Sequence, residues 1–390
     1  MATPPTKPSS TVFVVGSLNM DFIGIVKTHT ARRKHQPFKK DLERPGGHGA
    51  NQAVAVYRAS HCRPESRDDT SDGRLRSTSG PLAPTDIIDF EVHVHMVGMV
   101  GDDWGDVIKK ELQKNNVNTQ GIEIAPKGVK TGFAHIHVDG EGVPEISNSE
   151  GANGHLTPDT IKSWSPAPAM VLVQLEIPID TVRKVIEQAN AQNIPIIFNP
   201  APYNEKHNIL RQDKKLFKVD HLIVNAICTD DILDLPELTE QEFQHYGRRS
   251  EMQKRYINAC NEFHNLGAGC VVITLGSLGA IASYLEPKDT RGFRNPKIWI
   301  FGAKEGPNPL VDETGASDAF IGTYAVEILR QSRSASEKLD IGAAVELGIK
   351  AGGLAVANMG SMDSIPWRDE IYMPDRTFTA VSPFEFDEEA

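Results

Sequence analysis

Short apolar runs recur along the chain at the length of buried strands. The first is Val12-Phe13-Val14-Val15, and continuous runs of this kind are typical of parallel strands that are buried on both faces of a sheet. Between later runs lie stretches with helical periodicity, such as Thr181 to Gln192 and Arg255 to Leu266, which predicts the order strand, helix, strand. We therefore expect an α/β protein with a doubly wound, mostly parallel central sheet. The later apolar runs are Met170 to Leu175, Ile194 to Phe198, His221 to Val224 and Cys270 to Leu275.

Other segments depart from this alternation. Phe22 to Pro45 and Gly128 to Ser149 do not follow it, and within the second Ala134 to Val138 has the pattern of a strand that enters a turn, so the two segments are predicted to form a small separate sheet. Ser60 to Thr85 is rich in Arg, Asp, Ser, Gly and Pro, which cannot bury enough apolar surface to become ordered. We expect one large domain over residues 12–372, with a flexible insertion at about 60–85 and disordered tails at 1–11 and 377–390.

Composition and charge narrow the class of partner. The 390 residues include 41 Lys and Arg against 52 Asp and Glu, so the formal net charge is 41 − 52 = −11, which gives no general attraction to nucleic acid or to an anionic membrane. No apolar run approaches the roughly 18 residues of a membrane span. The four cysteines have no CxxC spacing, which indicates reduced thiols and a location in the cytoplasm, with the nucleus as a second location. A small-molecule substrate is therefore expected. The cysteines are Cys62, Cys228, Cys260 and Cys270.

The segment from Asp312 to Phe320, Asp-Glu-Thr-Gly-Ala-Ser-Asp-Ala-Phe, combines a turn of small residues with a carboxylate at the start of a predicted helix. Unpaired amide groups at a helix N-terminus bind anions, and the helix dipole favours phosphate there. Asp318 would lie in the first turn, where its carboxylate could accept a proton from a hydroxyl group. This pairing suggests phosphoryl transfer to an alcohol. The alternative is an ordinary helix start that carries an acidic residue for capping.

Polar residues near the first strand suggest a sugar site. Asn19 and Asp21 lie two apart, so in an extended chain both side chains point to one face, where an amide and a carboxylate can bind sugar hydroxyls. They could equally be turn-capping residues after a strand. The turn from Gly46 to Asn51, Gly-Gly-His-Gly-Ala-Asn, allows close backbone approach to a ligand, although it matches neither GxGxxG nor a Walker loop.

Two further candidates follow strands in the later part of the chain. Glu176 comes directly after the run Val171 to Leu175, where a carboxylate is paired within the protein or faces a ligand. The turn from Thr274 to Gly279 follows another strand and could admit adenine or its phosphates, or it could be a plain turn between two strands.

Taken together, these motifs resemble the ribokinase family of sugar and nucleoside kinases, and the resemblance spans most of the chain. The matching segments are Val15 to Asp21, Gly46 to Ala53, Gly98 to Asp103 with Gly105, Gln174 to Glu176, Asn199 to Pro202, Thr274 to Gly276, Asp312 to Asp318 and Ser364 to Trp367. The Ser60 to Thr85 insertion, the stretch from about Thr229 to Ser250 and both tails fall outside it.

The resemblance implies a ribokinase-like three-layer α/β fold with a small β-sheet lid, made of segments at about 21–46 and 128–149, that closes over the sugar and clasps a second subunit. It implies a kinase that uses ATP with Mg²⁺ and is activated by K⁺. In this interpretation Asp318 is the base, and the amides of Gly315, Ala316 and Ser317 form an anion hole. Asn19, Asp21, Gly47, His48, Asn51, Glu176 and Asp318 hold the sugar. Asn225, Thr274, Gly276, Gly279, Gly315 and Ser317 line the ATP site. Asp312, Thr314, Ala355, Asn358, Gly360 and Ser364 surround the monovalent cation.

Three positions depart from the family pattern. Ser317 stands where the family usually has glycine, and a left-handed serine would cost about 1 to 2 kcal/mol and distort the anion hole. His48 replaces the usual lysine, which predicts that one charged contact to the sugar is lost or becomes pH-dependent. Cys228 replaces the glutamate of the Asn-x-x-Glu motif that is linked to magnesium and phosphate, with Asp230 and Asp231 close by as possible substitutes.

The leading hypothesis is transfer of the γ-phosphoryl group of ATP to the 5-hydroxyl of D-ribose, which yields D-ribose 5-phosphate and ADP. A second hypothesis changes the acceptor to another pentose, a hexose or a nucleoside, although a nucleoside site would need apolar or aromatic cover for the base. A third is a catalytically weakened protein that binds sugar or nucleotide, because the three departures fall within functional motifs.

Overall fold

The structure is a computed structural model that describes residues 10–25, 40–64, 91–138, 144–164, 166–204, 207, 210–236, 249–286, 296–302, 312–333 and 339–373. Within these residues, no helix has the length and apolar character needed to cross a membrane.

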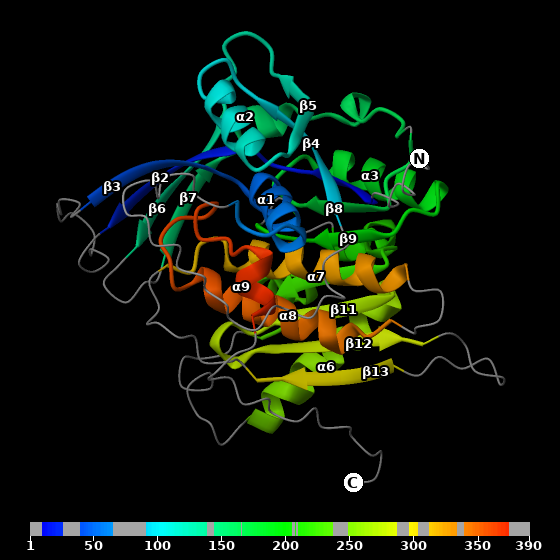
Figure 1. Ribbon diagram of the computed structural model, residues 1–390. Helices are drawn as coiled ribbons and strands as arrows, with labels where there is room; N and C mark the ends of the chain where they lie inside the picture. Colours follow the sequence, from blue (N-terminus) through cyan, green and yellow to red (C-terminus); the bar gives the residue numbers. More distant parts are fainter. Residues whose placement is uncertain are drawn as a thin grey trace, which may run out of the picture.

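A large sheet forms the centre of the molecule (Figure 1). Over the described residues it has nine strands in the order β13-β12-β11-β10-β9-β8-β1-β4-β5. Neighbouring strands from β11 to β5 are parallel, whereas the pairs β11–β12 and β12–β13 are antiparallel. The expectation of a mostly parallel central sheet is therefore confirmed. The strands are β1 (Ser10–Val15), β4 (Val92–Val100), β5 (Asn118–Ile124), β8 (Met170–Gln174), β9 (Ile196–Asn199), β10 (His221–Asn225), β11 (Cys270–Thr274), β12 (Ala280–Leu285) and β13 (Pro296–Phe301).

Helices cover both faces of this sheet, which makes three layers. Successive side chains of a strand point to opposite faces, so Val12 and Val14 pack in one apolar core with α1, α7 and α8. Val171 and Val173 pack in a second core with α3 and α6 on the other face. Figure 1 shows α7, α8 and α9 grouped together on one side. The helices are α1 (His48–Ser60), α2 (Gly105–Lys114), α3 (Ile179–Ala191), α4 (Ala226–Leu233), α6 (Arg249–Leu266), α7 (Ala316–Ser332), α8 (Ile341–Ala355) and α9 (Arg368–Tyr372), with short 3-10 turns at Gly151–His155, Pro158–Thr160, Leu210–Gln212, Lys214–Phe217 and Gly276–Leu278.

A second, smaller sheet projects from the central one (Figure 1). Its described strands are β2 (Asn19–Ile25), β3 (Lys40–Gly46), β6 (Gly132–Val138) and β7 (Pro144–Ser149), in the order β3-β2-β6-β7. Ile23, Ala134 and Ile136 form its own small apolar core. The two irregular segments of the sequence therefore do form a separate sheet. We call it the small sheet.

Several boundaries differ from those expected. β1 begins at Ser10, two residues before the expected domain start at 12. α7 begins at Ala316, so Ala316 and Ser317 from the expected turn of small residues already belong to the helix. The expected insertion lies outside the described residues from 65 to 85, as do the tails at 1–9 and 377–390 and the turn at Asp139-Gly140.

Candidate functional site

Asp318 lies in the first turn of α7 and is 1% exposed. Three side chains from the start of α1 contact its carboxylate. His48 Nδ1 lies 3.1 Å from Oδ1, Asn51 Nδ2 donates to Oδ2 at 2.9 Å, and Gln52 Nε2 donates to Oδ1 at 3.0 Å. α1 therefore holds the carboxylate in one orientation at the head of α7.

The turn before α7 leaves backbone amides at this helix terminus. Gly315 is the N-cap with a φ of 83°, and a Cβ at this position would lie 2.5 Å from Ser361 O, so only glycine fits. The first i to i−4 bond of α7 runs from Ala319 N to Gly315 O at 2.9 Å, so the amides of Ser317 and Asp318 precede it. The amide of Ala316 donates to Glu313 O at 3.3 Å, which is a long bond. The local geometry can accept an anion.

Ser317 does not take the left-handed conformation that would have made serine costly. It is the second residue of α7, it is exposed, and its φ is not positive. The left-handed residue of the turn is Gly315. The prediction that a left-handed Ser317 distorts the anion hole is therefore wrong, because the left-handed residue is Gly315, two positions earlier.

A second carboxylate lies beside the first strand of the small sheet. Glu176, which is 9% exposed, accepts hydrogen bonds from Ser17 Oγ at 2.5 Å and from Asn19 Nδ2 at 3.0 Å. The backbone N–H of His48 donates to it at 3.3 Å, as does Asn148 Nδ2 from β7 at 3.3 Å. Gly47, the N-cap of α1 with a φ of 91°, turns the chain so that His48 reaches both Glu176 and Asp318.

Asp21 is the third buried carboxylate, at 3% exposure. β2 is extended from Asn19, so the side chains of Asn19 and Asp21 lie on one face, as the spacing predicted. Ser361 Oγ donates to Asp21 Oδ2 at 3.0 Å. The pKa of Asp21 is raised to about 7, chiefly by burial and also by the charges of Glu176 and Asp318, although the Ser361 hydrogen bond and the charge of His48 lower it.

His48 is the basic residue among these carboxyl groups. Burial lowers the pKa of its imidazole, but the charge and hydrogen bond of Asp318, followed by the charges of Glu176 and Asp21, outweigh burial and raise the pKa to about 9. At neutral pH the imidazole is therefore protonated and faces three acidic side chains.

Further polar residues belong to the site, although the sequence analysis did not place them there. Gln52 links Asp318 to Asn199 Oδ1 at 3.2 Å and accepts from Gln174 Nε2 at 2.6 Å. Asn153 Nδ2 donates to Asn19 Oδ1 at 2.7 Å. Gln52 and Gln174 stand inside the motifs that were recognised, so they could have been found there, whereas Asn153 has no local signal.

Two polar atoms in the site, Asn51 Oδ1 and Gln174 Oε1, have no hydrogen-bond partner among the described residues. Asn51 Oδ1 is buried and accepts no hydrogen bond, although Asn51 Nδ2 is bonded to Asp318. A buried acceptor of this kind costs free energy unless a ligand hydroxyl satisfies it.

Of the residues expected at the ATP site, Gly315 and Ser317 lie at the start of α7, whereas Asn225, Thr274, Gly276 and Gly279 lie at or just after the ends of β10 and β11. The β10–β11 register pairs Asn225 with Thr274. The turn from Gly276 (φ 56°) to Gly279 (φ 100°) joins β11 to the antiparallel β12, so it is a turn between two strands, as the alternative interpretation had it. Its role in binding ATP stays a prediction.

Asn225 also caps α4, because its Oδ1 accepts from Cys228 N at 2.7 Å. Cys228 is buried, which raises the pKa of its thiol, so it supplies no negative charge where the family has glutamate. Asp230 contacts Arg255 Nη2 at 3.0 Å and Tyr256 OH at 3.2 Å, and its role in place of that glutamate stays a prediction. Asp231 is exposed on α4.

The residues expected around a monovalent cation form two bonded groups, one of Asp312, Thr314, Gly360 and Ser364 and the other of Ala355 and Asn358. Asp312 is fully buried and accepts from Thr314 N at 2.9 Å and from Gly360 N at 2.9 Å. Ser364 Oγ donates to Thr314 O at 3.4 Å, and Asn358 N donates to Ala355 O at 3.0 Å. Thr314 Oγ1 is buried without a partner, so this oxygen-rich set fits a cation. Asn358 is exposed and its side chain donates to Leu354 O, so its backbone carbonyl is the group that remains to contact a cation.

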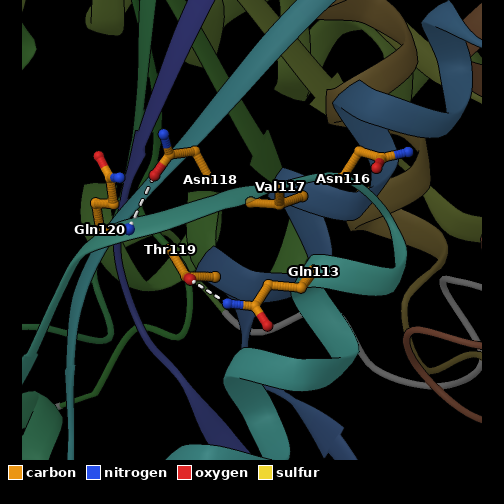
Figure 2. A pocket seen from close by; sticks show the side chains of 6 residues that line it. All are labelled: Gln113, Asn116, Val117, Asn118, Thr119 and Gln120. Atoms are coloured by element: carbon orange, nitrogen blue, oxygen red, sulfur yellow. Dashed lines mark hydrogen bonds between the residues drawn. The ribbon is translucent and has the colours of Figure 1, made fainter.

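A hollow of about 270 Å³ lies elsewhere, between the end of α2 and the start of β5 (Figure 2). Gln113 Nε2 donates to Thr119 Oγ1 across it at 3.0 Å. Its lining contains no charged side chain and no residue of the candidate site, so it is separate from the cluster around Asp318. The lining residues are Gln113, Asn116, Val117, Asn118, Thr119 and Gln120.

Comparison with known proteins shows what this chain is similar to in sequence and in fold. The model of the pfkB family carbohydrate kinases matches residues 9–368. The ribokinase of Bacillus subtilis is 28% identical, with 92% of this chain and 97% of that protein covered. The structure of ribokinase from Giardia lamblia has a TM-score of 0.69 at 24% identity, with 93% and 97% covered. Arabidopsis thaliana ribokinase complexed with ribose and ATP has a TM-score of 0.66 at 20% identity, with 93% and 98% covered. The two structures share the three-layer fold with this chain.

Proposed function

Because this chain belongs to the pfkB family of carbohydrate kinases, we propose that it transfers the γ-phosphoryl group of ATP to O5 of D-ribose. The products are D-ribose 5-phosphate and ADP. The observation that carries this proposal is the buried Asp318 at the head of α7, held by α1 residues of which His48 is also bonded to Glu176, in the polar cluster of Asn19, Asp21 and Glu176. The similarity to B. subtilis ribokinase supports the choice of sugar.

The polar cluster suits a small polyol. Asp21 and Glu176 accept hydrogen bonds, Asn19 and Asn51 can do both, and Gly47 lets the backbone come close to the sugar. The unpaired Asn51 Oδ1 would accept from a sugar hydroxyl, which removes the cost of leaving it buried and unbonded. A sugar bound here would present a hydroxyl to Asp318, since His48 contacts both Glu176 and Asp318.

The transfer step needs position and charge more than covalent chemistry. The O5–H proton passes to the carboxylate of Asp318, O5 forms a bond to the γ-phosphorus, and the bond between that phosphorus and the β–γ bridging oxygen breaks, with the electron pair leaving on ADP. The amides of Gly315, Ala316 and Ser317 would stabilise the negative charge of the phosphoryl group. Asn225, Thr274, Gly276 and Gly279 would line the nucleotide.

Two metal ions are part of the proposal. Mg²⁺ would enter with ATP and neutralise phosphate charge when bound. K⁺ would be held by oxygen atoms of Asp312, Thr314, Ala355, Asn358, Gly360 and Ser364, where the unpaired Thr314 Oγ1 supports the fit. Because Asp312 and Ser364 bond to Thr314, next to Gly315, a cation there would steady the turn that presents the amides.

The test is ADP release by the purified protein with ATP, Mg²⁺ and K⁺, with D-ribose, 2-deoxyribose, hexoses and nucleosides offered as acceptors. D-ribose should give the highest kcat/KM, and ³¹P NMR should place the phosphate on O5. A higher kcat/KM for another acceptor would replace D-ribose in the proposal.

A second candidate is a weakened enzyme that binds sugar or nucleotide, favoured by the neutral Cys228 in place of a carboxylate. Ribose binding by calorimetry without ADP release for any acceptor would favour it. In that outcome, restoration of ADP release by Cys228→Glu would identify the missing carboxylate as the cause.

We also propose that two copies pair through their small sheets. The support is the outer strand β7, whose residues Glu145 to Ser149 are all exposed, with Ile146 at 55%. Sedimentation should give a dimer, and Ile146→Lys should shift it toward the monomer. A monomeric wild type at micromolar concentration would contradict the pairing.

A further inference from the structure

We propose that His48 is a positioning residue that holds Asp318 through a charged hydrogen bond, so that turnover depends on the protonation state of its imidazole. The inference rests on the proposed kinase function and deepens it. It concerns a position where this chain differs from the lysine that the family usually has.

The first step is geometric. Of the three side chains that contact the Asp318 carboxylate, His48 is the one that can change charge, since Asn51 and Gln52 are neutral amides. The backbone of His48 is also held in place, because its N–H donates to Glu176 Oε2 at 3.3 Å. Its side chain is 28% exposed while that of Asp318 is 2% exposed, so protons can exchange between water and the imidazole.

The second step is electrostatic. The ionisable groups that face His48 are Asp318 from α7, Glu176 after β8 and Asp21 from β2, and all three are acidic. A protonated imidazole therefore lies among carboxyl groups and balances their charge. The raised pKa of His48, about 9, agrees with this arrangement.

The third step concerns the base. A protonated imidazole donates a charge-assisted hydrogen bond, which is roughly twice as strong as a neutral one. When the imidazole loses its proton, the bond to Asp318 becomes a neutral one, or is lost if the remaining proton sits on Nε2. Positive charge beside the incoming phosphoryl group disappears at the same time. Both changes lower the rate of transfer.

The pH profile of kcat tests this step with three proteins. Wild type should keep its kcat up to about pH 8 and lose it as the pH rises through about 9. In His48→Lys the loss should move upward toward about pH 10, since lysine ordinarily titrates near 10.4. In His48→Gln the kcat should be about tenfold lower at pH 7 and should show no fall near pH 9. An alkaline fall that persists unchanged in His48→Gln would overturn the inference.

NMR titration of the His48 imidazole gives a readout that needs no turnover. Its midpoint should lie near 9 in the wild type and should drop toward or below the ordinary value of about 6.5 in Asp318→Asn, because burial then acts against less opposing charge. His264, which bonds Ala268 O and Ser283 instead, is the internal reference and should not move. An unmoved His48 midpoint would exclude the coupling.

The two arms separate the inference from the proposed function. If no acceptor releases ADP but the His48 midpoint drops in Asp318→Asn, the kinase proposal fails and the His48–Asp318 coupling stands. If ribose is phosphorylated and the midpoint does not move, the coupling fails alone. Should Asp318→Asn not fold, the pH profile of His48→Lys decides.

Discussion

At the scale of single residues, the three carboxyl groups in the cluster around Asp318 differ in the hydrogen bonds that they accept. Asp318 has three side-chain neighbours, and Glu176 accepts from three side chains and one backbone N–H group. Asp21 has the hydrogen bond from Ser361, and burial raises its pKa to about 7. Three acidic residues in one cluster are therefore held in three different electrostatic environments, which suits them to different tasks.

Asp318→Asn should abolish most of the phosphoryl transfer while leaving the fold intact. An amide keeps the shape but cannot accept the O5 proton, so kcat should fall by roughly 10² to 10⁴. ADP release measures the rate, and circular dichroism checks the fold. Asp106→Asn, the same change at an exposed residue in the first turn of α2, is the matched control and should leave kcat unchanged. A fully active Asp318→Asn would refute its role as base.

Asp21 should make the folded state less stable as the pH rises. Its folded pKa of about 7 exceeds its ordinary value of 3.8, so the folded state binds the proton more tightly, and this stabilisation is present below about 4 and lost as the pH rises through 7. The slope can reach about 1.4 kcal/mol per pH unit. Urea unfolding from pH 4 to pH 8 should show this slope in the wild type and lose it in Asp21→Asn. Equal slopes in the two proteins would mean that Asp21 titrates normally.

At the scale of elements, the start of α7 depends on one backbone conformation. Gly315→Ala should destabilise the fold by more than about 1 kcal/mol, since a left-handed alanine is strained and its Cβ would meet Ser361 O at 2.5 Å. The displaced turn should also lower kcat. Gly353→Ala is the matched control inside α8, where a Cβ meets nothing within 4 Å, and it should be neutral or stabilising by up to about 1 kcal/mol. Thermal unfolding compares the two variants, and similar shifts would contradict this account.

At the scale of the whole molecule, the loop of residues 360–364 connects the small sheet to the turn before α7. Ser361 bonds Asp21 of β2, while Gly360 N donates to Asp312 at 2.9 Å. Asp363 contacts Arg44 Nε of β3 at 3.0 Å. A sugar bound against the small sheet would thus be coupled, through this loop, to the proposed anion and cation sites.

Breaking the Arg44–Asp363 pair should affect sugar binding more than stability. The pair is 44% and 53% exposed, so Arg44→Ala should change the free energy of unfolding by less than about 1 kcal/mol. The KM for ribose should rise several-fold, because the small sheet loses a contact to the 360–364 loop. Arg63→Ala removes a similarly exposed pair with Glu370 that does not involve the small sheet, and its KM should stay at the wild-type value. A KM that is equal in the two variants would argue against coupling through the loop.

Much of the fold could be predicted from local patterns. The apolar runs correspond to β1, β8, β9, β10 and β11, and the two irregular segments correspond to the small sheet. The boundaries of α1 and α7 were less predictable, because their first residues are small or polar and are ordered by contacts with Ser17 and Ser361 from other parts of the chain. β4 and β5 were not singled out, since polar residues interrupt their apolar pattern.

The candidate site, like the fold, was predictable in part from the sequence. Short-range motifs pointed to the glycine turn, the helix start and the carboxylates, because each motif is a few adjacent residues with a distinctive chemistry. The sequence alone thus determined the three-layer class and the inventory of polar groups. Tertiary structure decided that Gly315 takes the left-handed conformation, that Asp230 pairs with Arg255, and that His48 lies against Asp318 270 positions away. Such contacts depend on how helices and strands pack in space, which the spacing of residues along the chain does not encode.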